Sequence, residues 1–278
     1  MKIKKDQFAL HSQNKMIGLF FGDTDFPKKI LNRIKKLKKK YFIIDLSLHK
    51  KFKNDKYSYS ISIGQFGKII SLIKEKKCNK VLFAGKINKP KISSLKLDFK
   101  GLYYIPRILK ASKLGDAAIL KEIISILTKE KIKVISSISF NPELTLSKGI
   151  HTKLKPNKND HIYINKGIKS LRRINSHNHV QGLVIRNSFI ISRETSQGTK
   201  KMLQLIKRSK NSQGILIKFP KKKQDIRIDL PTIGFDTLKD CKRAGIKGIV
   251  LKSKQNIFLD KVKSINFANK NKMFIKIK

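Results

Sequence analysis

The sequence predicts an α/β protein of two domains, the first with a Rossmann-like parallel sheet and the second smaller and of mixed α/β type. Short apolar runs alternate with amphipathic stretches at helical spacing in both halves of the chain. A segment rich in Pro, Gly and polar residues separates the halves. The 278 residues, 40% of them hydrophobic, suffice for two ordinary domains with real cores, which argues against a disordered chain.

The first half, residues 1–140, carries the pattern of a doubly wound parallel sheet. Its apolar or alternating runs predict strands over residues 16–21, 41–46, 57–63, 81–84 and 132–138. Amphipathic stretches between them predict helices over residues 28–40, 66–76 and 116–130. The last of these helices begins at Asp116 and repeats apolar residues with the period of an α-helix.

Residues 141–160 change character, because Pro142, Gly149 and Pro156 interrupt a polar segment; we expect a linker or lid there. The alternation resumes over residues 161–278, which we interpret as the second domain. Helices are expected over residues 161–174, 199–210 and 238–244. Strands are expected over residues 182–185, 189–191, 215–218, 226–230, 248–251, 257–259 and 273–277.

The charge is extreme, with 65 Lys and Arg against 18 Asp and Glu, a formal net charge of +47. Nucleic-acid binding, attraction to an anionic membrane and compositional background all explain such a count. Few of the cationic residues are Arg, the residue that nucleic-acid-binding proteins favour for contacts with bases and phosphates. The Lys residues are spread along the chain. We therefore favour background and expect no specific nucleic-acid partner; a basic nucleic-acid-binding protein with an α/β core is the alternative. The runs 35–40 and 221–223 are candidate membrane contacts.

Several classes of protein lack support in the sequence. No apolar run reaches the ~18 residues of a membrane-spanning helix, and the first residues lack the apolar core of a secretory signal. Cys78 and Cys241 provide neither a disulfide framework nor metal-site spacing. A P-loop and a G-x-S-x-G nucleophile elbow are also absent. These observations favour a cytoplasmic protein.

Ligands of α/β proteins bind at the carboxyl ends of the strands, so charged residues there are candidates for a site. Asp229 lies in the string R-I-D-L-P-T-I-G, where a carboxylate suits Mg²⁺ but also suits an N-cap or a structural pair with Arg227. Glu194 precedes Gly198 and Thr199 at an expected helix start, which is a potential anion site. For Glu194, a role as ligand or base and a plain structural role both stay open.

Seven strings in a fixed order resemble one enzyme family over almost the whole chain. They lie at residues 63–69, 83–90, 115–120, 194–199, 218–221, 229–234 and 244–249. The set resembles the UDP-2,3-diacylglucosamine pyrophosphatase family of lipid A synthesis, of the type found in alphaproteobacteria. The resemblance implies a cytosolic hydrolase at the inner-membrane face. It would split its substrate into UMP and 2,3-diacylglucosamine 1-phosphate with Mg²⁺, holding the substrate between two α/β domains.

The resemblance also implies functional residues. The key aspartate falls on Asp229, as metal ligand or activator of water, in a C-terminal catalytic domain; Glu194 is the second catalytic candidate. The family's Gly-rich first loop is reduced here to Gly22, and Lys200 replaces a frequent acid, so a metal role at residue 200 is lost. The expected substrate-binding residues are Gly22, Gln65, Gly67, Lys68, Ala84, Gly85, Lys86, Asp116, Gly198, Thr199, Lys218, Lys221, Arg227, Pro231 and Thr232.

The expected partners follow from the same resemblance. They are the lipid-linked UDP-sugar substrate and the inner-membrane surface, on which the protein would sit peripherally. A homodimer is compatible with the sequence as well.

Overall fold

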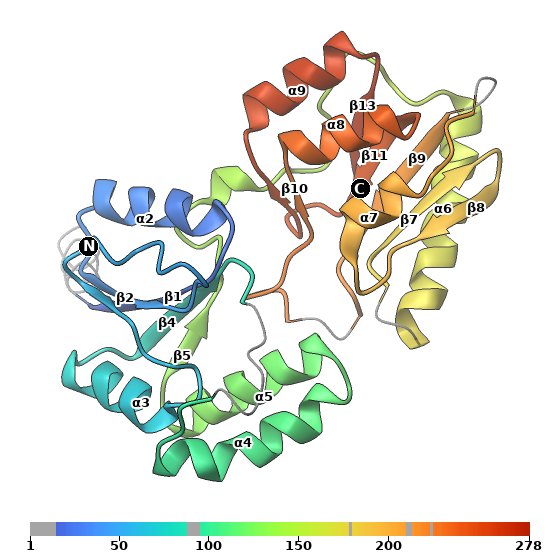
Figure 1. Cartoon of the computed structure of the whole chain (residues 1–278). Coiled ribbons are helices and arrows are strands. Elements are labelled where there is room, and N and C mark those ends of the chain that lie inside the picture. Colours follow the sequence, from blue (N-terminus) through green and yellow to red (C-terminus); the bar gives the residue numbers. More distant parts are fainter. Residues whose placement is uncertain (1–14, 88–94, 178–179, 210–212, 223–224) are drawn as a thin grey trace, which may run out of the picture. The chain divides into compact units, whose positions relative to one another are not determined.

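The computed structural model describes residues 15–87, 95–177, 180–209, 213–222 and 225–278 (Figure 1). The chain divides into two compact units, Met1–Asn141 and Pro142–Lys278. Each unit has its own sheet covered by helices, which confirms the prediction of two α/β domains.

The first unit contains a parallel sheet with strand order β3-β2-β1-β4-β5. Its strands are β1 (Ile17–Phe21), β2 (Tyr41–Asp45), β3 (Ser58–Tyr59), β4 (Lys80–Ala84) and β5 (Lys133–Ile135). Every residue of β1 and β2 is buried, as expected for a parallel sheet that is covered on both faces. The strand order reverses between β1 and β4, so a Rossmann-like switch point lies at their carboxyl ends.

Four helices belong to the described part of this unit. They are α2 (Phe26–Lys36), α3 (Phe66–Glu75), α4 (Phe99–Ser112) and α5 (Asp116–Lys129). Three of them correspond to predicted helices, but α4 was not predicted. Its apolar residues lie on both sides of the helix and Pro106 stands inside it, so the sequence shows neither a clean stripe nor a proline-free segment.

The second unit contains a mixed sheet with strand order β6-β13-β11-β9-β7-β8. Its strands are β6 (Gly149–Ile150), β7 (Gly182–Arg186), β8 (Phe189–Arg193), β9 (Gly214–Lys218), β11 (Ile246–Leu251) and β13 (Phe274–Ile277). The three central strands β13, β11 and β9 are parallel, and the outer ones are antiparallel to their neighbours. A separate short pair consists of β10 (Thr232–Ile233) and β12 (Ile257–Phe258).

Helices cover both faces of this mixed sheet (Figure 1). The long helix α6 (Lys158–His177) packs over side chains such as Ile217 and Phe274. The opposite face, with Leu216 and Ile275, is covered by α7 (Gly198–Gln204), α8 (Phe235–Arg243) and α9 (Lys261–Lys270). Successive residues of β9 thus enter different cores, because side chains alternate across a strand. Lys218 follows Ile217 and therefore lies on the α7 side.

Three segments differ from the sequence prediction for the second half of the chain. Residues 226–230 form a turn instead of a strand, since the amides of Ile228 and Asp229 both donate to the carbonyl of Asp225 (3.2 and 3.0 Å). Their alternating apolar residues imitate a strand pattern. Residues 141–160, expected as a linker or lid, include the 3₁₀-helix η2 (Pro142–Leu144), strand β6 and the fully buried Leu146. The helix predicted over residues 199–210 ends at Gln204.

Candidate active site

The loops that follow β1 and β4 lie against each other at the switch point of the first sheet. The amide of Gly22 donates to the carbonyl of Ala84 (2.9 Å), and Asp23 and Lys86 exchange two backbone hydrogen bonds (2.7 and 2.9 Å). A Cβ atom at Gly22 or Gly85 would come closer than 3.0 Å to the facing loop's backbone, and Gly85 has φ +86°. The structure thus brings together Gly22, Ala84, Gly85 and Lys86, and the two glycines permit this approach.

Replacing Gly85 with alanine is expected to destabilise the protein by about 3 kcal/mol or more. The left-handed backbone costs an alanine about 1–2 kcal/mol, and the carbonyl of Asp23 obstructs its Cβ. Gly198→Ala is a matched control, because Gly198 has φ +83° but no atom within 4 Å of the added Cβ. Urea denaturation should show the smaller backbone cost alone for this control. Equal losses would show that the loop contact is unimportant.

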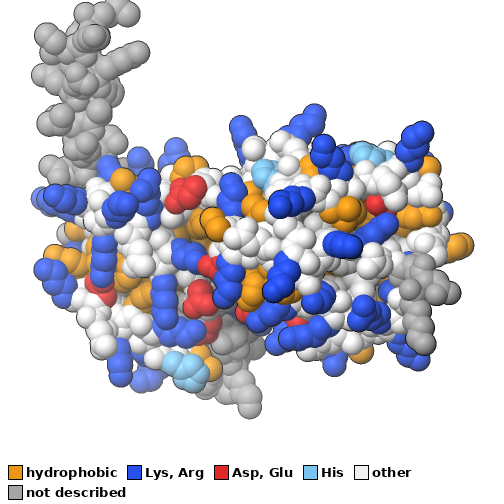
Figure 2. Space-filling model, turned by 90° about the horizontal axis from the view of Figure 1, so that it is seen from above, with side chains coloured by type: hydrophobic (Ala, Val, Ile, Leu, Met, Phe, Trp, Pro, Cys, Tyr) orange, Lys and Arg blue, Asp and Glu red, His pale blue; other side chains and the backbone are white. Residues whose placement is uncertain are grey.

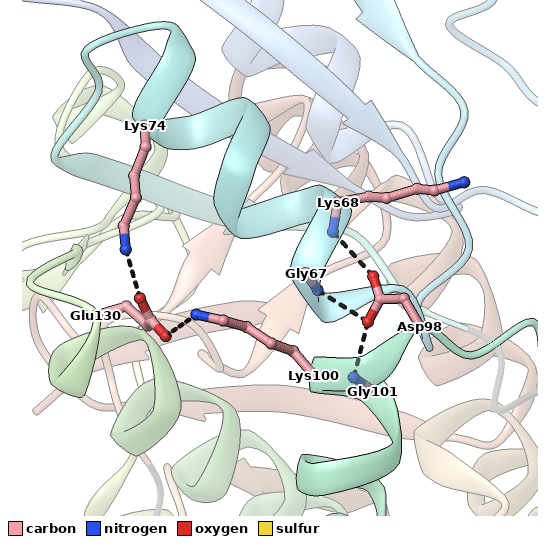
Figure 3. A network of polar contacts seen from close by, with 7 residues as sticks. All are labelled: Gly67, Lys68, Lys74, Asp98, Lys100, Gly101 and Glu130. Atoms are coloured by element: carbon pink, nitrogen blue, oxygen red, sulfur yellow. Dashed lines mark hydrogen bonds and ion pairs between the residues drawn. The ribbon is translucent and has the colours of Figure 1, made fainter.

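The start of helix α3 is occupied by a carboxylate of the chain itself (Figure 3). Asp98 accepts hydrogen bonds from the amides of Gly67 (3.0 Å) and Lys68 (2.9 Å), and also from Gly101 (2.8 Å) in α4. Gln65 is the residue before α3, and its side-chain oxygen accepts from the amide of Ser62 (3.3 Å). The amides of the predicted residues Gly67 and Lys68 therefore already have a hydrogen-bond acceptor. Asp98 acts as a cap for two helices, α3 and α4.

The three amides keep the Asp98 carboxylate ionised. Burial alone would raise the pKa of Asp98, but the hydrogen bonds from Lys68, Gly67 and Gly101 lower it below the ordinary value of 3.8. Asp98 is not among the residues predicted from the sequence. Its signal is that of an N-cap, an Asp directly before a helix whose third residue supplies the bonded amide.

Replacing Asp98 with alanine is expected to cost about 2–3 kcal/mol at pH 7, because the amides at two helix starts lose their acceptor. The pKa of Asp98 is lower in the folded state, so its contribution is complete above pH 3.8 and disappears as the pH falls through the folded-state pKa. Urea denaturation of both proteins at pH 7 and at lower pH should show this convergence. Glu75→Ala removes an exposed carboxylate paired with Lys76 and should have little effect at either pH.

In the second unit, three predicted residues meet at the carboxyl end of β9. Glu194 accepts from the Thr199 hydroxyl (2.8 Å), and its two carboxylate oxygens lie 3.1 and 3.4 Å from the Lys218 ammonium, which also contacts the Thr199 hydroxyl. Glu194 is 6% exposed and Lys218 is 5% exposed. Glu194 also lies directly against Gly182, where a Cβ would approach its carboxylate. The group is a buried ion pair with a hydroxyl bridge.

Asp229 lies on the loop that leaves β9 and enters β10. It is half-buried, and its amide is held by the carbonyl of Asp225. Arg227 is exposed and forms a bidentate pair with Asp225 (2.6–3.2 Å), which lowers the pKa of Asp225 and raises that of Arg227. The structural alternative considered for the string, an Asp–Arg pair, is therefore made by Asp225. Pro231 is buried and its carbonyl accepts from Ile257 (2.9 Å), which fixes the end of this loop.

The remaining predicted residues have simpler positions. Lys221 is half-buried on the loop after β9, and the exposed Thr232 begins β10, with its hydroxyl bonded to the carbonyl of Leu230 (3.2 Å). Gly198 begins α7. Asp116 begins α5, but its side chain lies outside the described residues, as does Lys223 of the run 221–223.

A cationic cavity of about 490 Å³ lies at the same carboxyl edge, on the α6 side of the sheet. Phe219 and Ile168 form apolar parts of its wall. Its cationic lining consists of Lys169, Arg172, Lys252 and Lys278. The sequence prediction did not include these residues, because three elements far apart in the chain supply them.

The described residues contain no group of three or more His, Cys, Asp or Glu side chains that would enclose a metal ion. Mg²⁺ in phosphate-processing sites is commonly held by one or two carboxylates, with substrate phosphate oxygens and water completing the shell. The half-buried Asp229 on a strand-end loop fits that mode of binding. Glu194 fits it less well, because both of its oxygens face Lys218.

Both units therefore place glycines, lysines and carboxylates at the carboxyl edges of their sheets, which defines a two-domain α/β protein with candidate ligand sites at its strand ends. Residues 16–144 match the LpxI N-terminal domain and residues 147–276 match the LpxI C-terminal domain. The chain belongs to the LpxI family. It is 28% identical over 268 residues to the UDP-2,3-diacylglucosamine pyrophosphatase LpxI of Caulobacter vibrioides, covering 93% of this chain and 96% of that protein.

Proposed function

We propose that this protein hydrolyses the pyrophosphate bond of UDP-2,3-diacylglucosamine in lipid A synthesis, releasing UMP and 2,3-diacylglucosamine 1-phosphate. The observation that carries the proposal is the match to both LpxI domains in order along the chain, together with a relative of that name aligned over nearly its whole length. The strand-end positions of the candidate residues support it, because a pyrophosphate requires charge neutralisation and a positioned water.

Asp229 is the residue that we assign to the chemistry. Hydrolysis needs a group that orients water toward phosphorus and accepts its proton, and an ionised carboxylate can perform both tasks. If Asp229 instead holds Mg²⁺, its charge serves to place that ion beside the phosphates. Mg²⁺, when bound, would neutralise phosphate charge and increase the electrophilicity of phosphorus. Asp229 and substrate phosphate oxygens would hold it.

Glu194 is better suited to positioning than to proton transfer. Its carboxylate lies against the buried ammonium of Lys218 and accepts a hydrogen bond from Thr199. We assign Glu194 to holding Lys218 at the end of β9, and Lys218 and Thr199 to the polar edge that faces the substrate's charge. In the first unit, Gly22 and Gly85 let the two loops pack together at the switch point, where we place the contacts of that unit with the ligand.

The net charge of +47 does not by itself distinguish the proposed hydrolase from a nucleic-acid-binding protein, so the distribution of the charged side chains has to decide. Figure 2 shows Lys and Arg side chains distributed over the visible face instead of gathered in one stripe. A dedicated nucleic-acid surface is expected to concentrate them. We therefore propose a lipid-linked UDP-sugar as the partner, and a cytoplasmic location with peripheral attachment to the inner membrane. Among the described residues, no helix combines the length and apolar character needed to cross a membrane.

The proposal is tested by incubating the purified protein with UDP-2,3-diacylglucosamine in detergent, with Mg²⁺ or with a chelator. Release of UMP together with the diacyl sugar phosphate is the expected result, and the chelator should abolish it. Absence of UMP release by folded protein would disprove the activity. Equal rates of UMP release with and without chelator would disprove the requirement for Mg²⁺ and leave the proposed activity in place.

A further inference from the structure

Helix α4 exposes large apolar side chains on its outer side. Phe99 is 92% exposed, Leu102 59% and Tyr103 69%. These residues lie on one face, since positions three and four apart are neighbours on a helix. The inner side of α4 is different, because Tyr104 and Ile105 are buried in a core with Phe66, Ile70 and Ile126. The helix thus has an inner core face and an outer apolar face.

Polar contacts join α4 to the helices beside it. Asp98 caps the start of α4 through the amide of Gly101 (Figure 3). Glu130, directly after α5, pairs with Lys100 of α4 and with Lys74 of α3 (2.7 Å). Arg107 pairs with Glu122 of α5 (2.6 Å). The apolar face is therefore preformed on the domain, and a partner would bind it without ordering the helix.

The exposed charged side chains next to this face are positive. Helix α4 contains no Asp or Glu, and Lys110, Lys113 and Lys96 are exposed at its end and just before its start. The first turns therefore present aromatic and aliphatic groups, and the end of the helix presents exposed lysines next to Leu114, which is also exposed. Apolar and aromatic residues bordered by lysines are typical of helices that lie in the interface of an anionic bilayer.

We propose that the outer face of α4 docks the protein on an anionic lipid bilayer, with Phe99, Leu102 and Tyr103 inserted among the headgroups. This inference deepens the proposed function and in part rests on it, because an enzyme with a diacylated substrate needs access to the bilayer that holds it. Docking through α4 differs from docking through the lysine run 35–40, whose Lys35 is paired with Asp55 (2.7 Å). The exposed apolar groups, and not the charge alone, identify the surface.

The test is flotation of the full chain with phosphatidylcholine vesicles and with vesicles containing about one third phosphatidylglycerol. The variant carries Phe99→Ser and Leu102→Ser. Its control carries Phe189→Ser and Val262→Ser, which remove groups of similar exposure, 72% and 74%, from the second unit. We expect the α4 variant to bind anionic vesicles at least about tenfold more weakly than wild type, and the control to bind within about twofold.

Equal vesicle binding by the α4 variant and the control variant would overturn the proposal. Wild-type protein that binds neutral and anionic vesicles equally well would also overturn it. So would a protein partner that binds the wild type more tightly than vesicles do and that the α4 substitutions prevent from binding. Turnover of substrate in detergent separates this proposal from the enzymatic one. It should change by less than about twofold in the α4 variant, because detergent replaces the bilayer. Lost turnover with unchanged vesicle binding would assign the face to substrate acyl chains and disprove docking. Vesicle binding without any wild-type turnover would disprove only the activity.

Discussion

Replacing Asp229 with asparagine is expected to lower kcat for UDP-2,3-diacylglucosamine by roughly 10²–10⁴-fold. Asparagine keeps the size of the side chain and removes its charge and its ability to accept a proton. The backbone hydrogen bond from residue 229 to the carbonyl of Asp225 does not depend on the side chain, so the turn should persist. The loss should therefore appear in the rate and not in the free energy of unfolding.

The measurement is UMP release at saturating substrate and Mg²⁺, accompanied by a thermal denaturation curve. Asp236→Asn is a suitable control, because Asp236 lies in the first turn of α8 and its carboxylate pairs with Lys239 at the surface (2.6 Å). Its kcat should stay within about twofold, since exposed pairs contribute little. An Asp229→Asn protein with the full wild-type rate would remove Asp229 from the chemistry while leaving the activity in place.

Replacing Glu194 with glutamine is expected to destabilise the protein by about 3–5 kcal/mol, because it leaves the buried ammonium of Lys218 without its counter-charge. The two groups are among the most buried charges of the second unit, so water cannot compensate for the lost partner. Lys218→Met alone should also be unfavourable, since it strands the Glu194 carboxylate. The double variant Glu194→Gln with Lys218→Met should recover much of the lost stability.

Urea denaturation of wild type, both single variants and the double variant forms a complete double-mutant cycle. If Lys218 also contacts substrate phosphate, the double variant will be stable but slow, and this result distinguishes a functional lysine from a structural one. Additive losses in the cycle would contradict coupling of the pair. Recovery of both stability and rate in the double variant would show that the pair serves the fold alone.

The sequence predicted the regular parts of the fold well where the pattern was local. The apolar runs at residues 16–21 and 41–46 lie close to β1 and β2, since strands buried on both faces read as continuous apolar segments. The helix expected at residues 116–130 corresponds to α5 because its apolar period is clean. Helix α4 was missed for the opposite reason: it has apolar residues on two faces, one in the core and one outside.

Candidate residues could be chosen from the sequence only by type and by position after a strand. Glu194, Thr199 and Lys218 were chosen in this way, and the structure joins them. Their partnership could not be foreseen, because β8 and β9 are not neighbours and β7 lies between them in the sheet. Asp98 was overlooked because its function as a cap for two helices depends on the close approach of α3 and α4.

The sequence by itself determined the α/β class, the resemblance to one enzyme family and the strand-end segments that carry polar residues. These properties depend on local pattern and on short motifs, which a linear chain records directly. Only the tertiary structure decided that Glu194 neutralises Lys218, that Asp98 occupies the amides at two helix starts, and that the outer face of α4 is exposed. Burial and pairing are properties of groups brought together from distant parts of the chain, so their energies exist only once the chain has folded.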